Sequence, residues 1–360
     1  MRGAVILVFA VLFRVTLLFS PPTLSDDLYR YVWDGRTQNH GINPYRYPPN
    51  APELAGLRDA YYPGINNKPI PTVYPPLMEI VFRGVDRIAH TPMAMKVVFV
   101  LCDLGVIVLL GLLLRTHHLP IVRMVIYAWN PLVLVEVAGS GHNDPLAVGL
   151  MLAALLALTA GRPILSVVSL ALSVVSKLFA VVLLPSVARA MPRKRALLLF
   201  PVVVGLLYLP YLDAGRHLTT GLFVYGNKWR FNDSLFTLAL SVTGDLTLAK
   251  VIVGVFFLGV VITRLRGPES PVRTAYVLIG AYLILTPTVQ SWYLLWLLPF
   301  LCFFPNRAWL LLSGLIMLSY HVLIQFTRTG LWREALWVRY VEYIPFYALL
   351  MFDAIKGRKG

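Results

Sequence analysis

Charged residues are scarce in this sequence of 360 residues. Asp, Glu, Lys and Arg make up 14% of it, whereas hydrophobic residues make up 58%. A soluble globular domain carries about 25% charged residues, so the composition excludes that class. Acidic residues are rarer than basic ones, with 17 Asp and Glu against 32 Lys and Arg. The sequence therefore predicts an integral membrane protein, embedded in membrane lipids.

Motifs of several common chemistries are absent. The sequence has no Gly-rich phosphate loop, no His/Cys spacing typical of zinc and no G-x-S-x-G elbow. It also lacks a soluble nucleotide-binding domain with a D-x-D motif, so we expect neither a cofactor nor a metal. Asp26-Asp27 could still hold a divalent ion. Cys102 and Cys302 lie in apolar runs, where cysteine behaves as a small hydrophobic residue, and no disulfide is predicted.

Apolar runs recur along the whole chain, most of them near the ~20 residues that cross a bilayer. The candidate spans are 4–20, 94–114, 121–138, 144–160, 195–213, 247–265, 272–287, 292–304, 306–326 and 339–354. Two more segments are ambiguous, because 75–90 is short and charged and 163–188 has Lys177 in its middle. We expect one all-α polytopic membrane domain over residues 1–360, with about ten to twelve transmembrane helices.

The first apolar run is expected to be a retained helix, because no A-x-A-like cleavage site follows it. After it comes the sizeable polar stretch 21–74, which is rich in Pro, Tyr and Asn. A loop this long and this aromatic is typical of a packed cap with short helices.

Basic residues gather in short loops, which indicates membrane topology rather than nucleic-acid binding, despite a formal charge of +15. The basic segments are 189–195 with Arg193-Lys194-Arg195, 264–273, the Asn306-Arg307 turn and the tail from Lys356 to Lys359. Cytoplasmic loops carry the excess of Lys and Arg, so these segments are expected inside. The segments expected outside are 21–74, 213–246, the turn 288–292 and 327–338. At the last of these, the charges of Arg328, Arg333, Glu334 and Arg339 are expected to be simply solvated.

The topology between residues 75 and 188 has two solutions. Either each apolar segment crosses once, or 75–90 lies at the interface and 163–188 forms a helical hairpin. Counting basic residues hardly separates the two. The second is favoured, because it brings the motif Gly141-His142-Asn143-Asp144 to the same face as the other polar motifs.

The densest polar motif is SDDLYRYVWDGR at 25–36, directly after the first span. A helix beginning at Asp27 would place Arg30 and Asp34 on one face, so that the arginine pairs with one carboxylate while another stays free. A free carboxylate near the interface is a candidate general base that takes a proton from an attacking hydroxyl. The alternative, of equal weight, is an Arg–Asp network that only folds the loop.

Ionisable residues between apolar helices form a second group of candidates. His142, Asn143 and Asp144 lie between two spans, and Lys177 is a lone ammonium in SVVSKLFAVVLLP. Asn143 or Asp144 could instead cap the following helix. Lys177 could contact a lipid phosphate, snorkel to the interface or pair with Asp144.

Cations and aromatics of the outer loops are the third group. Lys228 and Arg230 could stabilise a leaving phosphate, and Trp229 could stack on a sugar or an isoprenoid. Tyr74, in the Pro-rich stretch TVYPP, could also line a sugar-stacking wall. For these aromatics the alternative is an interfacial anchor.

These motifs together resemble a known family. The order SDDLYRYVWDGR, GINPYRYPP, TVYPP and GHND, then a Lys before an apolar run ending at Pro185, is similar to polyprenol-phosphate-sugar-dependent glycosyltransferases of the GT-C fold. The likeness is to bacterial family 87 mannosyltransferase-type proteins and, more distantly, to the catalytic subunit of glycosylphosphatidylinositol mannosyltransferase I. It covers residues 24 to about 300.

The resemblance implies roles for individual residues. Asp27 falls where these families place the catalytic carboxylate of the first outer loop, with Asp26 as its rival. Donor phosphate binding is expected from Lys177, His142, Lys228 and Arg230, and substrate binding from Asp34, Arg30, Asn143, Asp144, Tyr74, Trp229, Gln290, Trp292 and Tyr293. Family members often carry His-Pro-Trp-Tyr where this chain has Gln290-Ser291-Trp292-Tyr293, and the Gln290 amide cannot carry charge.

The function implied is transfer of a hexose, expected to be mannose, from a polyprenyl-phosphate donor to a lipid-linked or glycan hydroxyl. Inversion at the anomeric carbon, a bacterial inner membrane and an extracytoplasmic active site are also implied. The alternative is a transporter or flippase of isoprenoid-linked sugars that performs no chemistry. Such transporters usually show repeated halves, and no internal repeat is visible in this sequence.

Overall fold

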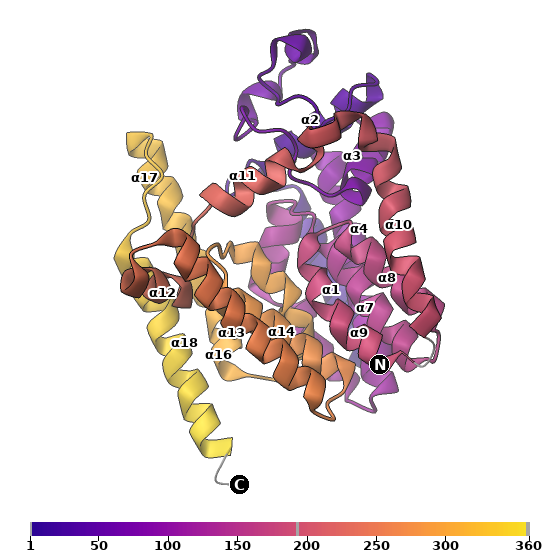
Figure 1. The fold of residues 1–360 in the computed structure, drawn as a ribbon, viewed down its shortest axis with the longest axis vertical. Helices are drawn as coiled ribbons and strands as arrows, with labels where there is room; N and C mark the ends of the chain where they lie inside the picture. Colours follow the sequence, from indigo (N-terminus) through magenta and orange to yellow (C-terminus); the bar gives the residue numbers. More distant parts are fainter. Residues whose placement is uncertain (1, 192–193, 358–360) are drawn as a thin grey trace.

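The computed structural model describes residues 2–191 and 194–357, most of which are helical (Figure 1). Four helices of this part are long and apolar enough to cross a membrane: Pro92–Thr116, Lys194–Lys228, Leu246–Arg266 and Arg307–Thr329. A bent pair, Ile121–Ala128 with Pro131–Gly139, adds a fifth if it counts as one span. The prediction of an all-α polytopic membrane protein is confirmed. Arg193, Arg358 and Lys359, three of the basic residues used for the topology, lie outside the described residues.

The first half of the chain forms a helical bundle. Its elements are α1 (Arg2–Leu18), α4 (Pro92–Thr116), α5 (Val125–Ala128), α6 (Pro131–Val133), α7 (Asp144–Thr159), α8 (Pro163–Val174) and α9 (Leu184–Ala190), with 3-10 turns at Ile121–Met124 and Leu178–Leu183 and a π-helix at Leu134–Gly139. An ion pair fixes α1 to this bundle, because Arg14 Nε lies 2.5 Å from a carboxylate oxygen of Asp103 in α4 and both side chains are buried. Charges this deep are tolerated when paired.

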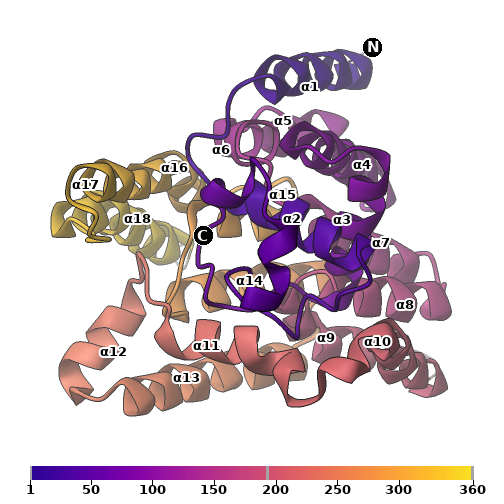
Figure 2. The ribbon, with the colours of Figure 1, turned by 90° about the horizontal axis from the view of Figure 1, so that it is seen from above.

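A cap covers one end of the bundle (Figures 1 and 2). It consists of α2 (Asp27–Asn39), α3 (Pro76–Ile88) and 3-10 turns at Pro52–Leu57 and Tyr62–Gly64. The two helices touch at Gly35, where a Cβ would lie 2.5 Å from the Phe82 carbonyl oxygen. Residues 21–74 thus fold into a packed cap with short helices, as their composition predicts.

The second half of the chain wraps the bundle. It comprises α10 (Leu199–Tyr208), α11 (Thr220–Lys228), α12 (Leu235–Thr243), α13 (Leu246–Arg266), α14 (Pro271–Leu285), α15 (Leu298–Leu301), α16 (Arg307–Leu315), α17 (His321–Thr329) and α18 (Leu336–Gly357), with 3-10 segments at Lys194–Leu198, Leu209–Thr219, Ser291–Trp296 and Ile316–Tyr320. α13 exposes large apolar side chains such as Val255 and Phe256, as a lipid-facing helix does.

The predicted continuous span 292–304 is wrong. The chain there is a 3-10 turn, Ser291–Trp296, followed by the short α15. Its side chains are almost all buried in the protein. Irregular backbone at membrane depth is tolerated when protein surrounds it.

The structure selects the second topology for residues 75–188. Gly141, which has a positive φ of 77°, lies against the cap, because a Cβ on it would be 2.6 Å from Leu28 Cδ2. After α8 the chain reverses at Lys177 and returns through Leu178–Leu183 and α9, so 163–188 is a hairpin. Its tip meets the cap, where the Leu77 amide donates to the Val175 carbonyl at 3.0 Å. The GHND motif and the first polar motif therefore share one face.

Candidate functional site

The site begins where the hairpin tip meets the start of α7. Lys177 Nζ donates to Asp144 Oδ2 at 2.6 Å and to Asn143 Oδ1 at 3.3 Å. Asp144 is fully buried, while the Lys177 side chain is 20% exposed. Of the alternatives for Lys177, the structure shows the pair with Asp144. The ammonium nonetheless keeps an open side through which an anion could approach.

Aromatic rings wall this ion pair. Trp296 Nε1 donates to the second oxygen of Asp144 at 2.5 Å. The Trp296 ring stacks on the Tyr293 ring with centroids 4.2 Å apart, and Lys177 Nζ lies 5.9 and 5.8 Å from the two centroids. Ring faces stabilise a nearby cation. Asp144 is thus fully occupied, and the rings confine the ammonium to one position.

His142 lies beside this pair in a polar group of its own. The His142 ring stacks on Trp292 with centroids 3.9 Å apart. Its Nδ1 lies 3.0 Å from Glu136 Oε2 and 3.1 Å from the Glu136 carbonyl. Both partners are acceptors, so Nδ1 carries a proton and Nε2 faces the other way. The Tyr320 hydroxyl, at 2.8 and 3.0 Å, holds the same carboxylate.

Glu136 escaped prediction from the sequence. It is fully buried and belongs to the π-helix Leu134–Gly139, and such turns often mark functional sites. A signal was present, because Glu136 is a carboxylate inside a candidate span and such residues are functional candidates by default.

Two unpaired buried nitrogens lie in the motif that binds Lys177. His142 Nε2 and Asn143 Nδ2 are buried and have no hydrogen-bond partner among the described residues. The side chain of Asn143 does not cap α7, since its oxygen is bound to Lys177 instead. Buried nitrogens of this kind are normally paired. The Asn143 amide and the Lys177 ammonium are donors that could bind phosphate oxygens, and His142 Nε2 can join them in the doubly protonated ring.

The two candidate bases lie at the start of α2. Asn66 Nδ2 donates to Asp26 Oδ1 at 2.6 Å and to Asp27 Oδ1 at 2.8 Å. Asp26 is exposed and Asp27 is half-buried. Leu28, the next residue along α2, packs against Gly141 at the start of the GHND motif. Asp27 therefore lies near the same region as the Glu136–His142 group.

Arg30 and Asp34 are paired inside the cap, as their spacing predicts. Arg30 Nε lies 2.9 Å from each Asp34 oxygen, and both side chains are buried. Beside them the Glu79 carboxylate accepts from Thr72 at 2.6 Å and from Gln38 at 2.8 Å. Burial and the nearby Asp34 carboxylate raise the pKa of Glu79 well above its ordinary value. These contacts show a folding network, so substrate binding by Arg30 and Asp34 stays a prediction without support from geometry.

The loop after α11 reaches the site through its aromatic residues rather than its cations. The Tyr225 hydroxyl bonds that of Tyr293, and the Trp229 ring packs against Tyr225 with centroids 5.5 Å apart. Lys228 is exposed at the end of α11. Arg230 is bound to Asp233 at 3.1 Å, so its charge is already neutralised. Phosphate binding by Lys228 and Arg230 therefore stays a prediction.

Two more predicted contacts lie at the edge of the site. The ring of Tyr74 is edge-on to Tyr31 and Phe82, with centroids 5.2 and 5.3 Å away, which is packing within the cap. Gln290 is half-buried and immediately precedes the turn that carries Trp292 and Tyr293. Substrate binding by Tyr74 and Gln290 stays a prediction.

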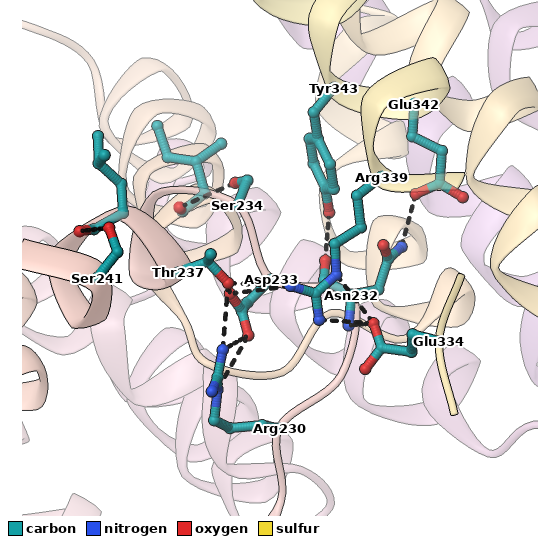
Figure 3. A network of polar contacts seen from close by, with 12 residues as sticks. Arg230, Asn232, Asp233, Ser234, Thr237, Ser241, Glu334, Arg339, Glu342 and Tyr343 are labelled. Atoms are coloured by element: carbon teal, nitrogen blue, oxygen red, sulfur yellow. Dashed lines mark hydrogen bonds and ion pairs between the residues drawn. The ribbon is translucent and has the colours of Figure 1, made fainter. Parts of the chain in front are cut away.

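The outer segment 327–338 is not simply solvated. Figure 3 shows Arg339 in contact with Glu334 at 2.7 Å and with Thr237 at 2.9 Å, while Glu334 accepts from the Asn232 amide at 2.8 Å. Glu342 accepts from the Asn232 side chain at 2.6 Å. This network joins α12 to α18 and explains the charges as structural. The expectation of free solvated charges was wrong for Glu334 and Arg339.

Comparison with known proteins identifies the family. A model described as alpha-(1->6)-mannopyranosyltransferase, N-terminal domain, matches residues 1–193, and one described as MptB C-terminal domain matches residues 235–352. A probable alpha-(1->6)-mannopyranosyltransferase of Mycolicibacterium smegmatis is 27% identical over 83% of this chain and 64% of its own length. Alpha-(1->6)-mannopyranosyltransferase A of Mycobacterium tuberculosis is 30% identical over 49% of this chain and 34% of its own.

The chain thus spans less than two thirds of the length of the curated relatives it matches. The N-terminal model alone covers more than half of the chain and includes the cap, the GHND motif and Lys177. The resemblance to family 87 mannosyltransferase-type proteins of the GT-C fold is confirmed, and this chain belongs to the alpha-(1->6)-mannopyranosyltransferase family.

Proposed function

We propose that this protein transfers a mannosyl residue from a polyprenyl-phosphate donor to a hydroxyl of a lipid-linked or glycan acceptor. One observation carries the proposal. The Lys177 ammonium and two unpaired buried nitrogens, on His142 and Asn143, gather on the face that also holds the half-buried Asp27 carboxylate. The names of the relatives support mannose as the sugar.

The reaction needs opposite charges on the two sides of the anomeric carbon. The acceptor oxygen attacks that carbon, and its proton passes to the Asp27 carboxylate, with Asp26 as the alternative base. The bond between the anomeric carbon and the phosphate oxygen breaks, and its electron pair stays on the phosphate. A single displacement of this kind inverts the anomeric configuration.

Lys177, His142 and Asn143 would hold the leaving phosphate. The ammonium offers charge, and Nδ2 of Asn143 offers an N–H donor as negative charge develops. Nε2 of His142 becomes a second N–H donor when the imidazole carries both protons, with the Glu136 carboxylate as its counter-ion. Glu136 and Trp292 fix the imidazole so that Nε2 faces the site. These groups are held in position before substrate binds. Such preorganisation gives electrostatic catalysis most of its rate enhancement.

The proposal places the protein in a bacterial inner membrane with this site on the extracytoplasmic face. The basic ends of α9, α13 and α18 lie at the opposite end of the molecule from the cap (Figure 1). Cytoplasmic loops carry the excess of Lys and Arg, so the cap belongs outside.

The test uses purified protein in nanodiscs with a synthetic polyprenyl-phosphate mannose and a panel of mannoside and lipid-linked acceptors. The expected products are free polyprenyl phosphate and an acceptor enlarged by one mannose. A glucosyl donor of the same lipid should react much more slowly. Movement of intact donor across the bilayer without release of polyprenyl phosphate would instead support the flippase alternative.

A further inference from the structure

A polar cavity lies far from the candidate site. It has a volume of about 190 Å³ and opens between α9, α13 and α14. Its lining residues are Ser186, Arg189, Ala190, Arg264, Leu265, Glu269, Pro271 and Thr274. The helical arm from Lys177 to Arg189 separates it from the candidate site by roughly 20 Å. The cavity therefore belongs to the end of the molecule that carries the basic loops.

Charge in this cavity is positive and incompletely paired. Arg189 Nη1 donates to the Gly267 carbonyl at 2.5 Å, so its charge meets no carboxylate there. Arg264 Nη1 binds Glu269 Oε1 at 2.6 Å. Arg264 Nε and Glu269 Oε2 are both buried and have no partner in the part of the chain that the structure describes. Two guanidinium groups thus face one carboxylate.

Further donors converge on the same space. The residues Ser186 and Thr274 are buried in its wall. The N-terminus of α14, a helix of 15 residues, begins at Pro271 in the lining. A helix N-terminus carries a partial positive charge. Hydroxyls, guanidinium groups and a helix end are the groups that bind phosphate oxygens.

The rim of the cavity continues onto a lipid-facing surface. Leu265 lines the cavity, and Ile262 and Leu258, on the preceding turns of α13, are 40% and 56% exposed. Only 11% of the apolar stretch of α13 is buried inside the protein. A molecule with a phosphate in the cavity and hydrocarbon along α13 would satisfy both surfaces.

We propose that this cavity binds the phosphate headgroup of an anionic phospholipid from the cytoplasmic leaflet. Basic pockets between membrane helices on that side select anionic headgroups. The phosphate gains charge-assisted hydrogen bonds to the cations, whereas the positive group of a zwitterionic headgroup is repelled by them. The bound lipid joins α9 to the α13–α14 turn. It therefore stabilises the arm whose other end carries Lys177, and this inference does not depend on the proposed reaction.

The test compares lipids added to detergent-purified full-length protein. Phosphatidylglycerol should raise the midpoint of thermal unfolding and remain bound in native mass spectrometry, whereas phosphatidylcholine should do neither. Inorganic phosphate at the same concentration should have no effect, because it lacks the acyl chains. The double variant Arg189→Gln/Arg264→Gln should bind phosphatidylglycerol on the order of 30-fold more weakly, since each cation contributes about fivefold.

Two controls make the outcome decisive. Lys356→Gln removes a cation from the same end of the molecule, outside the cavity, and should leave phosphatidylglycerol binding unchanged. Glu269→Gln removes the competing carboxylate and should strengthen binding, which tests the site even if the double variant does not fold. Equal effects of the two lipids, an equal effect of inorganic phosphate, or unaltered binding by both Glu269→Gln and the folded double variant would overturn the proposal.

Discussion

The Lys177 ammonium lies 2.6 Å from the Asp144 carboxylate, at the point where the 163–188 hairpin turns back beneath the cap. Trp296 occupies the second oxygen of that carboxylate at 2.5 Å. The carboxylate therefore positions the lysine, whose side chain as a whole stays 20% exposed. Pairing with Asp144 and binding of a phosphate are compatible roles for this lysine, because an ammonium has three donors.

Lys177→Ala should lower mannosyl transfer by roughly 10²-fold, whereas Lys177→Arg should lose much less because it keeps a cation at the phosphate. The measurement is the rate of polyprenyl phosphate release. Removing the lysine also leaves Asp144 unpaired, so the control is Lys177→Ala/Asp144→Asn, which removes the lone charge. If the double variant regains wild-type activity, the lysine serves only to neutralise Asp144.

Glu136→Gln should reduce kcat roughly 10-fold with a small change in KM for the donor. The amide keeps the shape of the side chain but no longer offers a carboxylate to His142 Nδ1, so the imidazole loses its fixed orientation. A double-mutant cycle separates this role from a purely structural one. In a His142→Gln background, Glu136→Gln should cost almost nothing. Equal losses in both backgrounds would show that Glu136 does not act through His142.

Glu79→Gln should make thermal stability less dependent on pH. Burial and the adjacent Asp34 carboxylate raise the pKa of Glu79 well above 4.5, with Arg30 as the facing cation. The unfolded chain therefore loses this proton at lower pH than the folded chain, so the wild type becomes less stable as pH rises above about 4.5. The variant should match the wild type near pH 5 and exceed it at pH 8.

Glu53→Gln is the control for this measurement, because Glu53 lies in the same cap but is exposed. It should follow the wild type at both pH values. A steeper loss of stability with pH in Glu79→Gln than in the wild type would contradict the assignment of a neutral, buried Glu79.

Much of this arrangement was predictable, for reasons that particular residues illustrate. Local spacing placed Arg30 and Asp34 on one helix face, and the resemblance carried by the first motif gave the family. The contacts of Arg339 with Thr237 and of Glu334 with Asn232 were not predictable. They come from segments about a hundred residues apart, and no local pattern records such pairing. The contact of Glu136 with Tyr320 was not predictable either, because Tyr320 lies far along the chain.

The broken backbone of residues 291–301 was missed for a related reason. Hydropathy reports that a segment is apolar, and it cannot distinguish a lipid-facing helix from irregular chain buried in protein. The topology of 75–188 was open in the sequence because basic-residue counts balanced. Packing of Gly141 against Leu28 decided it, and that contact joins residues from separate motifs.

Cysteine labelling should place the cap outside the membrane. After Cys102 and Cys302 are replaced by alanine, cysteines at Asn50 and Asn227 should react with a membrane-impermeant thiol reagent in intact cells, because both positions are exposed. A cysteine at the exposed Lys194 should react only after the cells are opened. Labelling at Lys194 from outside, with none at Asn50, would reverse the proposed orientation.

Asp27→Asn tests the base, because the amide keeps the shape of the carboxylate and cannot accept the proton. A general base should lose ~10²–10⁴-fold in rate with little change in donor binding. The Asn66 amide, which donates to both carboxylates at 2.6 and 2.8 Å, can hold the variant in place. The assay uses purified protein and a synthetic polyprenyl-phosphate mannose, with thermal unfolding as the check on folding.

Asp26→Asn and Asp34→Asn are the matched comparisons. Asp26 is exposed and shares Asn66, so its loss should cost less than that of Asp27. Asp34 is buried against Arg30, so Asp34→Asn should act by destabilising the cap, which unfolding would reveal. Near-full turnover of Asp27→Asn together with an inactive, folded Asp26→Asn would transfer the role to Asp26. If all three variants stayed active, none of these three carboxylates could be the base, and the proposed mechanism would fail.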